Sequence, residues 1–391
     1  MDAYIVAGYR TAVGKAHRGG FRFTRPDDLA ADVIKHLVKS VPGLENNMVD
    51  DLFVGNAVPE AEQGMQMGRM VSLLALGMDI PGMVVNRYCG SGLETIAIAS
   101  QRIQAGQADV IIAGGTESMS LVPVMGYKTA LNYKIAKENP TYYTSMGLTA
   151  EEVSRQYKVS REAQDQFSYE SHMKAEAAWQ AGKFKDEVVP ITVKETYVDE
   201  DMRRKTREYV VDRDEGIRPD TTPEGLAKLK PVFAVGGSVT AGNSSQTSDG
   251  AAFVVVMSDK MVNQLGLKPV ARLVSYATAG VDPRIMGIGP VAAVPKALKI
   301  AGMKLDDMDL IELNEAFAAQ SLAVVEKLGI DRAKLNVNGG AIAVGHPLGS
   351  TGARLSVQLF NEMRRQKKKY GMVTACVGGG QGVAGVYEFL N

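Results

Sequence analysis

The sequence predicts an α/β protein built from two similar halves with a polar insertion between them. Three observations predict this fold class. Strand and helix patterns alternate near both ends of the chain, a glycine-rich turn precedes a helix pattern in each half, and charged residues concentrate in the middle. Strands that alternate with helices form sheets with helices packed on their faces, and we expect both sheets to be mostly parallel.

The first half begins directly with a strand pattern at residues 1–6. Residues 50–58 contain a second strand pattern, and the strand ends at Asn56. The glycine-rich segment 86–92 follows. Apolar residues then recur at helical spacing after Cys89, and residues 108–115 have the composition of a buried strand.

The second half repeats this order. A strand pattern within residues 307–317 ends at Asn314, the glycine-rich segment 338–349 follows, and we expect a helix from 351 to about 368 before a strand at 370–376. Cys89 follows Asn56 by 33 residues, and His346 follows Asn314 by 32. This spacing indicates an internal repeat in which Cys89 and His346 occupy matching strand-to-helix turns.

The middle of the chain has a different composition. Residues 148–182 have the pattern of an amphipathic helix, and residues 186–230 are rich in charge. Residues 251–257 are continuously apolar, which predicts a buried central strand that returns to the first half. We expect the polar insertion to cap one edge of the paired sheets.

Composition excludes several functional classes. Lys and Arg total 44, as do Asp and Glu, so the zero formal charge argues against a general nucleic-acid binder. Two cysteines exclude a disulfide scaffold and a four-cysteine zinc site, and the four histidines lack metal-ligand spacing, so we expect no metal. No apolar run approaches the ~18 residues of a membrane span, and no targeting peptide is apparent, so we expect a cytoplasmic protein.

Cys89 and His346 are the candidate nucleophile and base. A thiol at a helix N-terminus faces free amides and the positive end of the helix dipole, which lower its pKa. Cysteine paired with histidine is the minimal activated nucleophile. The alternatives are an ordinary buried cysteine in a tight turn and a histidine that caps a helix.

Cys376 and Asn314 complete the candidate site. Cys376 ends the last long strand before three glycines, whose amides can hold a developing oxyanion. The alternative is a glycine-rich turn with an incidental thiol. Asn314 ends its strand just before a helix pattern, where a helix cap and a functional role carry equal weight.

Four segments together resemble the thiolase family: residues 86–94, 314–317, 339–349 and 376–382. The resemblance covers the whole chain. It implies two similar βαβαβαββ halves stacked in five layers (αβαβα), with an inserted loop domain. The implied division is 1–118 plus 250–268 for the N-terminal half, 119–249 for the loop domain that covers coenzyme A (CoA), and 269–391 for the C-terminal half.

The resemblance also implies the residue roles. Cys89 would be the nucleophile that carries the acyl group as a thioester, and His346 would take its proton. Cys376 would be the acid/base that protonates the departing acetyl-CoA enolate. One oxyanion hole would use His346 and a water held by Asn314, and the other the amides of Cys89 and Gly378.

The substrates implied are CoA thioesters, with no permanently bound cofactor. The implied CoA contacts are Ser245 beside the pantetheine, Arg218 near the adenine and phosphate end, Met146 and Phe317. Family members are dimers or tetramers, so we expect a homo-oligomer, as a homotetramer if the loop domain joins the subunits.

The subtype is predicted to be degradative, a 3-ketoacyl-CoA thiolase of fatty-acid β-oxidation. Biosynthetic thiolases typically carry His-Met-Gly where this chain has residues 145–147, Ser-Met-Gly, and residues 118–126 and 380–382 resemble degradative members. The alternatives are an acetoacetyl-CoA-forming thiolase and a non-catalytic thiolase-like binder of lipid or CoA. A decarboxylating ketoacyl synthase is a more distant rival, since it would lack Cys376.

Overall fold

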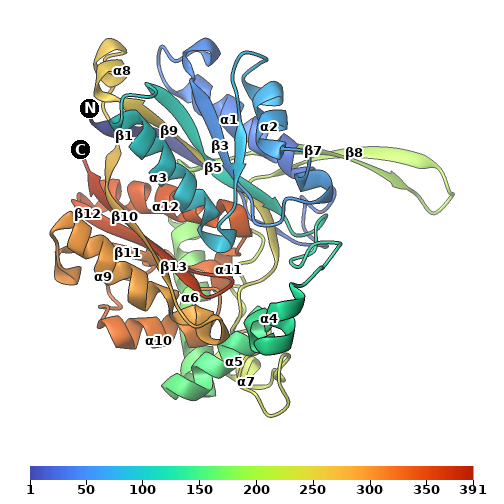
Figure 1. Cartoon of the computed structure of the whole chain (residues 1–391). Helices are drawn as coiled ribbons and strands as arrows, with labels where there is room; N and C mark the ends of the chain where they lie inside the picture. Colours follow the sequence, from blue (N-terminus) through green and yellow to red (C-terminus); the bar gives the residue numbers. More distant parts are fainter. Residues whose placement is uncertain (391) are drawn as a thin grey trace.

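Two β-sheets face each other across a pair of central helices in the computed structural model, which describes residues 1–390 (Figure 1). The strands share one hydrogen-bonded order, β11-β12-β13-β10-β1-β9-β5-β3-β4, in which β1 and β10 are joined through the single register pair Ile5 and Ala271. This link divides the order into a first sheet, β4-β3-β5-β9-β1, and a second, β11-β12-β13-β10. The first contains β1 (Ala3–Thr11), β3 (Asp51–Gly55), β4 (Met83–Val85), β5 (Val110–Ser118) and β9 (Ser248–Ser258). The second contains β10 (Ala271–Gly280), β11 (Leu310–Leu313), β12 (Tyr370–Val377) and β13 (Gln381–Phe389).

The two sheets have the same order and the same strand directions. β3 runs parallel to β5, and β9 lies antiparallel between β5 and β1. In the second half β11 runs parallel to β12, and β13 lies antiparallel between β12 and β10. This match confirms the internal repeat. Within residues 269–390, the place that β4 has in the first half is taken by a single bridge between Ile311 and Leu335 and not by a full strand.

The expectation of mostly parallel sheets was wrong. Each sheet is mixed, because β12 turns directly into β13 and because β9 returns from the insertion next to β5 in the opposite direction. A tight turn joins antiparallel strands, whereas parallel neighbours need a crossover connection. The predicted strand at 251–257 is the central part of β9, and it is fully buried as expected.

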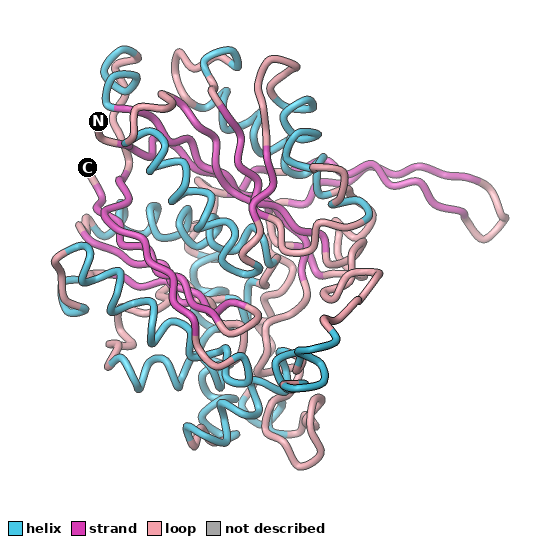
Figure 2. Tube along the Cα trace, in the orientation of Figure 1, coloured by secondary structure: helices cyan, strands magenta, loops and turns pink. Residues whose placement is uncertain are grey.

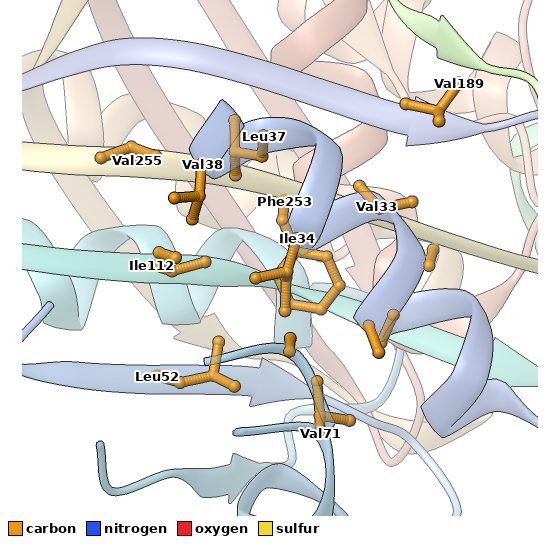
Figure 3. Packing of buried hydrophobic residues seen from close by; sticks show 14 of the residues in the cluster. Val33, Ile34, Leu37, Val38, Leu52, Val71, Ile112, Val189, Phe253 and Val255 are labelled. Atoms are coloured by element: carbon orange, nitrogen blue, oxygen red, sulfur yellow. The ribbon is translucent and has the colours of Figure 1, made fainter. Parts of the chain in front are cut away.

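Helices cover both faces of both sheets, which confirms the five-layer α/β fold. Helices α1 (Pro26–Ser40) and α2 (Met67–Ala75) cover the outer face of the first sheet, where Ile34 and Leu37 of α1 pack on Ile112 and Phe253 (Figure 3). Helices α3 (Ser91–Gln104) and α12 (Thr351–Gln366) form the middle layer. Helices α9 (Gly289–Ala301) and α10 (Ala318–Leu328) cover the second sheet.

The chain between β5 and β9 forms a helical region and a projecting ribbon. The expected amphipathic helix is two helices, α5 (Met146–Tyr157) and α6 (Arg161–Gln180), because Lys158 adopts a left-handed conformation with φ of 55° and ends α5. Strands β7 (Ile191–Val198) and β8 (Arg204–Val211) pair as a long hairpin that extends away from the body (Figure 2). The remaining short elements are α4 (Tyr133–Glu138), α7 (Pro223–Ala227), α8 (Asp259–Gln264), α11 (Ala341–Val344), β2 (Gly14–Lys15) and β6 (Val188–Val189).

A buried ion cluster ties this region to the first sheet. Arg10 of β1 is fully buried and donates from Nε to Glu187 at 2.8 Å, and from Nη1 and Nη2 to Asp214 at 2.7 and 3.0 Å. Asp214 also accepts the amide of Val13 at 2.8 Å. Because Glu187 and Asp214 both lie between β5 and β9 in sequence, the cluster docks the inserted chain onto β1. The exact limits of the three predicted domains stay a prediction.

The two central helices approach each other most closely through glycines related by the repeat. A Cβ on Gly92 would lie 2.8 Å from the nitrogen of Ala353, and a Cβ on Gly352 would lie 2.3 Å from the nitrogen of Leu93. Each glycine is the second residue of its helix, so the two contacts are equivalent. The first turns of α3 and α12 therefore meet at the axis that relates the two halves.

Gly352→Ala should destabilise the protein by about 1–3 kcal/mol, because the added methyl group would collide with backbone that cannot rotate away. We expect a lower urea midpoint together with reduced activity. Gly280→Ala is the matched control, since a Cβ there meets no atom within 4 Å. Equal stability of the two variants would show that α3 and α12 separate without cost.

Candidate active site

Cys89 lies in a short 3-10 turn, Tyr88–Gly90, that leads directly into α3. Its side chain is buried, with 3% exposure. Burial raises the pKa of its thiol, and the backbone amides of Gly378 and of Cys89 itself lie near enough to the sulfur to act against that shift. Gly378 follows the end of β12, so the two glycine-rich turns of the two halves meet at this sulfur. These are the two amides that the sequence predicted for one oxyanion hole.

Burial raises the pKa of the Cys376 thiol on β12, and negative charge on nearby Cys89 raises it further. It is buried beside Phe317 and Ala316, in an apolar cluster to which Met146 adds a partly buried side chain. The structure therefore brings both cysteines of the chain to one place, although they are far apart in sequence.

His346 and Asn314 form a second pair. The Nδ2 atom of Asn314 lies 3.2 Å from Nε2 of His346, and both side chains are buried. Asn314 follows β11 directly and is fixed by its own amide, which donates to Thr374 at 2.9 Å. Leu348, two residues after His346, packs in the same apolar cluster as Cys89, so the histidine segment borders the cysteine turn.

Burial sets the protonation of the three titratable groups. Loss of water raises the pKa of Cys89 to about 12, against the lowering effect of the two amides, and raises that of Cys376 further. It lowers the pKa of His346 to about 3. The expected lowering of the Cys89 pKa by the helix N-terminus was thus wrong, because desolvation outweighs the amide contacts in this closed site. At neutral pH both thiols are protonated and the imidazole is neutral.

Three of the four predicted CoA contacts lie near Cys376. Met146 and Phe317 pack in its apolar cluster, and the amide of Ser245 donates to Ala316 at 2.9 Å. Arg218 is not joined to this group. Its side chain is exposed, and its backbone amide donates to Nδ1 of His172 at 3.2 Å.

Two family models cover nearly the whole chain. The thiolase N-terminal domain matches residues 3–260, and the thiolase C-terminal domain matches residues 267–389. The chain belongs to the thiolase family. Thiolases are acyltransferases, so this protein is an enzyme of that class.

Similar proteins carry two different names. A 3-ketoacyl-CoA thiolase of Bacillus subtilis is 52% identical over 99% of both chains. An acetyl-CoA acetyltransferase of Pseudomonas aeruginosa is 46% identical over 98% of both. The crystal structure of the Bacillus anthracis acetyl-CoA acetyltransferase superposes with a TM-score of 0.90 at 40% identity, covering 100% of this chain and 99% of that one.

Sequence reasoning missed Glu117, a fully buried carboxylate at the end of β5 that braces this thiolase site. One oxygen accepts the amides of Ala57 and Gly349, both at 2.8 Å, and the other accepts Gln63 at 2.7 Å and Asn56 at 3.1 Å. It fixes the segment that carries His346 against the end of β3. The available signal was a carboxylate close after the apolar and glycine run 110–115, since carboxylates are rarely buried without partners.

A second group that was missed clamps the Cys89 turn to the other half. Arg87 forms an ion pair with Glu94 and donates to Gln381 at 2.9 Å, and Tyr276 donates to Glu94 at 2.5 Å. Gln381 in turn donates to the carbonyl of Gly378 at 3.4 Å. The clamp therefore connects the two turns that supply the amides at the Cys89 sulfur.

Two further findings bear on the sequence predictions. No helix within residues 1–390 is long and apolar enough to cross a membrane. In the same residues, no group of three or more His, Cys, Asp and Glu side chains is arranged to hold a metal ion.

Proposed function

We propose that this thiolase cleaves 3-ketoacyl-CoA with free CoA, giving acetyl-CoA and a shortened acyl-CoA through an acyl-enzyme on Cys89. The observation that carries the proposal is that the Gly378 turn and the second thiol, Cys376, both come close to Cys89 although they belong to the other half. A nucleophile, two oxyanion donors and a second acid/base group thus meet at one point.

In the first half-reaction, the Cys89 sulfur attacks the 3-keto carbon while its proton passes to His346. The amides of Cys89 and Gly378 stabilise the oxyanion that forms. The bond between the second and third carbons of the acyl chain then breaks, and Cys376 protonates the departing acetyl-CoA enolate at carbon. The thioester oxygen of that enolate is held by His346 and by a water bound to Asn314, whose Oδ1 has no protein partner among residues 1–390.

In the second half-reaction, the thiol of free CoA replaces acetyl-CoA. It gives its proton to Cys376, which became a thiolate in the first half-reaction, and its sulfur attacks the thioester on Cys89. The shortened acyl-CoA leaves, and Cys89 recovers a proton from His346. Because acetyl-CoA leaves before free CoA binds, we expect ping-pong kinetics.

The high pKa of the Cys89 thiol supports concerted activation. Because burial keeps the thiol protonated and the imidazole neutral, the residues do not rest as a thiolate–imidazolium pair. Proton transfer to His346 therefore accompanies attack on the substrate, when the oxyanion donors compensate the new charge.

The degradative direction is the finer part of the proposal. It rests on Ser145 in place of the histidine typical of biosynthetic members and on the 52% identity to a protein named 3-ketoacyl-CoA thiolase. The second candidate, acetoacetyl-CoA formation, is supported by relatives named acetyl-CoA acetyltransferase.

A chain-length series of 3-ketoacyl-CoA substrates in the thiolysis direction tests the proposal. We expect C6 to C12 substrates to be cleaved at least as efficiently as acetoacetyl-CoA, measured as kcat/KM. Turnover confined to acetoacetyl-CoA would favour the acetyl-CoA acetyltransferase activity. Binding of acyl-CoA without turnover of any chain length would identify a non-catalytic binder.

Cys376→Ser should separate acyl transfer from turnover. The serine hydroxyl is a far weaker acid than a thiol, so protonation of the enolate and deprotonation of CoA should slow by about 100-fold or more. Mass spectrometry should still find an acyl adduct on Cys89. Full steady-state turnover in this variant would remove Cys376 from the acid/base role.

The CoA contacts and the assembly complete the proposal. We assign the pantetheine to the region of Ser245, Met146 and Phe317, and the phosphates to exposed Arg218, with no other cofactor. Homo-oligomerisation is supported by exposed apolar side chains beside the free edge of β4, including Met65, Leu74 and Met78 with 89%, 45% and 81% exposure. A homotetramer and a cytoplasmic location stay predictions from the sequence.

A further inference from the structure

Thr351, the first residue of α12, lies against the face of His346 that points away from Asn314. Its Oγ1 atom is 2.6 Å from Nδ1 of His346 and 2.9 Å from the carbonyl oxygen of Pro347. Thr351 is fully buried and His346 is 4% exposed, so neither group can exchange its partner for bulk water. A neutral imidazole carries one proton, and the partners of its two nitrogens decide which nitrogen holds it.

The contacts of Pro347, Thr351, His346 and Asn314 form one consistent chain of donors. If Thr351 donates its single proton to Pro347, its oxygen is free to accept from Nδ1–H of His346. The other ring nitrogen, Nε2, then carries a lone pair, which accepts from Nδ2 of Asn314 at 3.2 Å. Each donor in this chain has an acceptor, as buried polar groups require.

The reverse chain is the competing arrangement. Thr351 would donate to Nδ1, and Nε2–H would donate to a reversed Asn314 amide, which would leave no lone pair on Nε2. Pro347 accepts two other donors, the amide and hydroxyl of Ser350 at 3.1 and 3.0 Å, so it does not by itself demand the Thr351 proton. The choice therefore needs an independent observation.

The other half of the molecule provides it. Ser91 is the first residue of α3 and the repeat equivalent of Thr351, because each follows a 3-10 turn and precedes the glycine of the helix contact. Its Oγ donates to the carbonyl of Tyr88 at 2.7 Å and accepts the amide of Arg87 at 2.8 Å. A backbone amide can only donate, so the direction at Ser91 is fixed. Its hydroxyl donates a hydrogen bond to the carbonyl of Tyr88 and accepts one from the amide of Arg87.

We propose that Thr351 uses its hydroxyl in the same direction and is a positioning residue that holds His346 as the Nδ1–H tautomer. Nε2 is thereby kept as an acceptor on the side of Asn314. The inference deepens the proposed function, since it explains how His346 is ready to receive the proton of Cys89.

Solid-state ¹⁵N NMR of protein labelled at histidine tests the tautomer without reference to activity. The chain has only four histidines, and loss of a signal pair in His346→Asn assigns His346. At pH 7 we expect a protonated Nδ1 and an unprotonated Nε2 in the unmodified protein. An unprotonated Nδ1 with a protonated Nε2 would overturn the proposal.

Thr351→Val and Thr351→Ser are the matched pair of variants. Valine removes the acceptor but keeps the shape, so Nδ1–H loses its partner; the tautomer signals should shift toward Nε2–H and kcat/KM should fall by about 100-fold. Serine keeps the hydroxyl and should keep both the signals and the activity. A valine variant with unchanged signals or unchanged kcat/KM would contradict the proposal, as would a serine variant that loses the Nδ1–H signal.

These outcomes separate the inference from the proposed function. Unmodified protein that shows the Nδ1–H tautomer but cleaves no 3-ketoacyl-CoA would overturn the proposed function and leave the tautomer assignment standing. Circular dichroism of each variant checks the fold. If the valine variant does not fold, the spectra of the unmodified protein and the serine variant still decide the tautomer.

Discussion

Cys89→Ala is expected to abolish 3-ketoacyl-CoA cleavage, with a loss in kcat of at least about 10⁴-fold. In the proposed mechanism the sulfur forms the covalent bond to the acyl group, and it lies beside the Gly378 amide and the Cys376 thiol. Removing a nucleophile leaves only the rate contributed by binding and oxyanion stabilisation. Steady-state thiolysis assays measure the loss.

The fold of this variant should persist, with a change in stability within about 1 kcal/mol, because the substitution removes a single buried atom that makes only weak hydrogen bonds. Incubation with 3-ketoacyl-CoA should give no acyl adduct by mass spectrometry, whereas Cys376→Ser should give one. Thiolysis at the original rate in Cys89→Ala would refute the covalent mechanism.

Arg10→Met should cost about 3–5 kcal/mol of stability, the largest effect on folding that we expect from one substitution. It leaves the carboxylates of Glu187 and Asp214 buried at 0% and 2% exposure without their cation. The loss of stability arises from two buried carboxylates without a cation and not from lost contact area, so the urea midpoint should fall steeply.

Arg272→Met is the matched control. Arg272 pairs with Glu388 at 2.7 Å, but its side chain is 42% exposed, so its loss should cost less than about 1 kcal/mol. Adding Glu187→Gln and Asp214→Asn to Arg10→Met should restore part of the stability, because both stranded charges are then removed. Equal urea midpoints for Arg10→Met and Arg272→Met would contradict this account.

The elements and their order could be predicted from the sequence because they are local patterns. The strand at 251–257, the helix from Thr351 and the two glycine-rich turns each leave a periodicity or a composition that a short segment displays. Strand direction could not be predicted in the same way. It depends on how β9 re-enters the sheet after 129 intervening residues, from 119 to 247, and no local pattern encodes that path.

The site was predictable in its residues and not in its electrostatics. Cys89 and Cys376 stand out because they are the two cysteines of the chain and both lie in glycine-rich segments. The pKa of Cys89 depends on how completely the assembled halves exclude water, which is a property of packing. Glu117 and Thr351 escaped notice for a related reason: their partners, Gly349 and His346, are identified only by the three-dimensional contacts.

The sequence repeat predicted that Cys89 and His346 occupy equivalent positions, but the structure shows that they do not. When the halves are aligned on the first residues of α3 and α12, Ser91 and Thr351, the partner of Cys89 is Gly349 and the partner of His346 is Asn86. Both functional residues lie in the same kind of turn, but three positions apart along it.

This offset distinguishes the chain from a symmetric pair of identical halves. In a symmetric pair, the axis between Gly92 and Gly352 would place the same residue at equivalent positions of both halves, so a cysteine in one half would have a cysteine at the equivalent position of the other. In the present chain, the position equivalent to Cys89 holds Gly349, and the position equivalent to His346 holds Asn86. Because both halves belong to one polypeptide, their matching turns can differ in sequence, and the proposed nucleophile and base come from different halves.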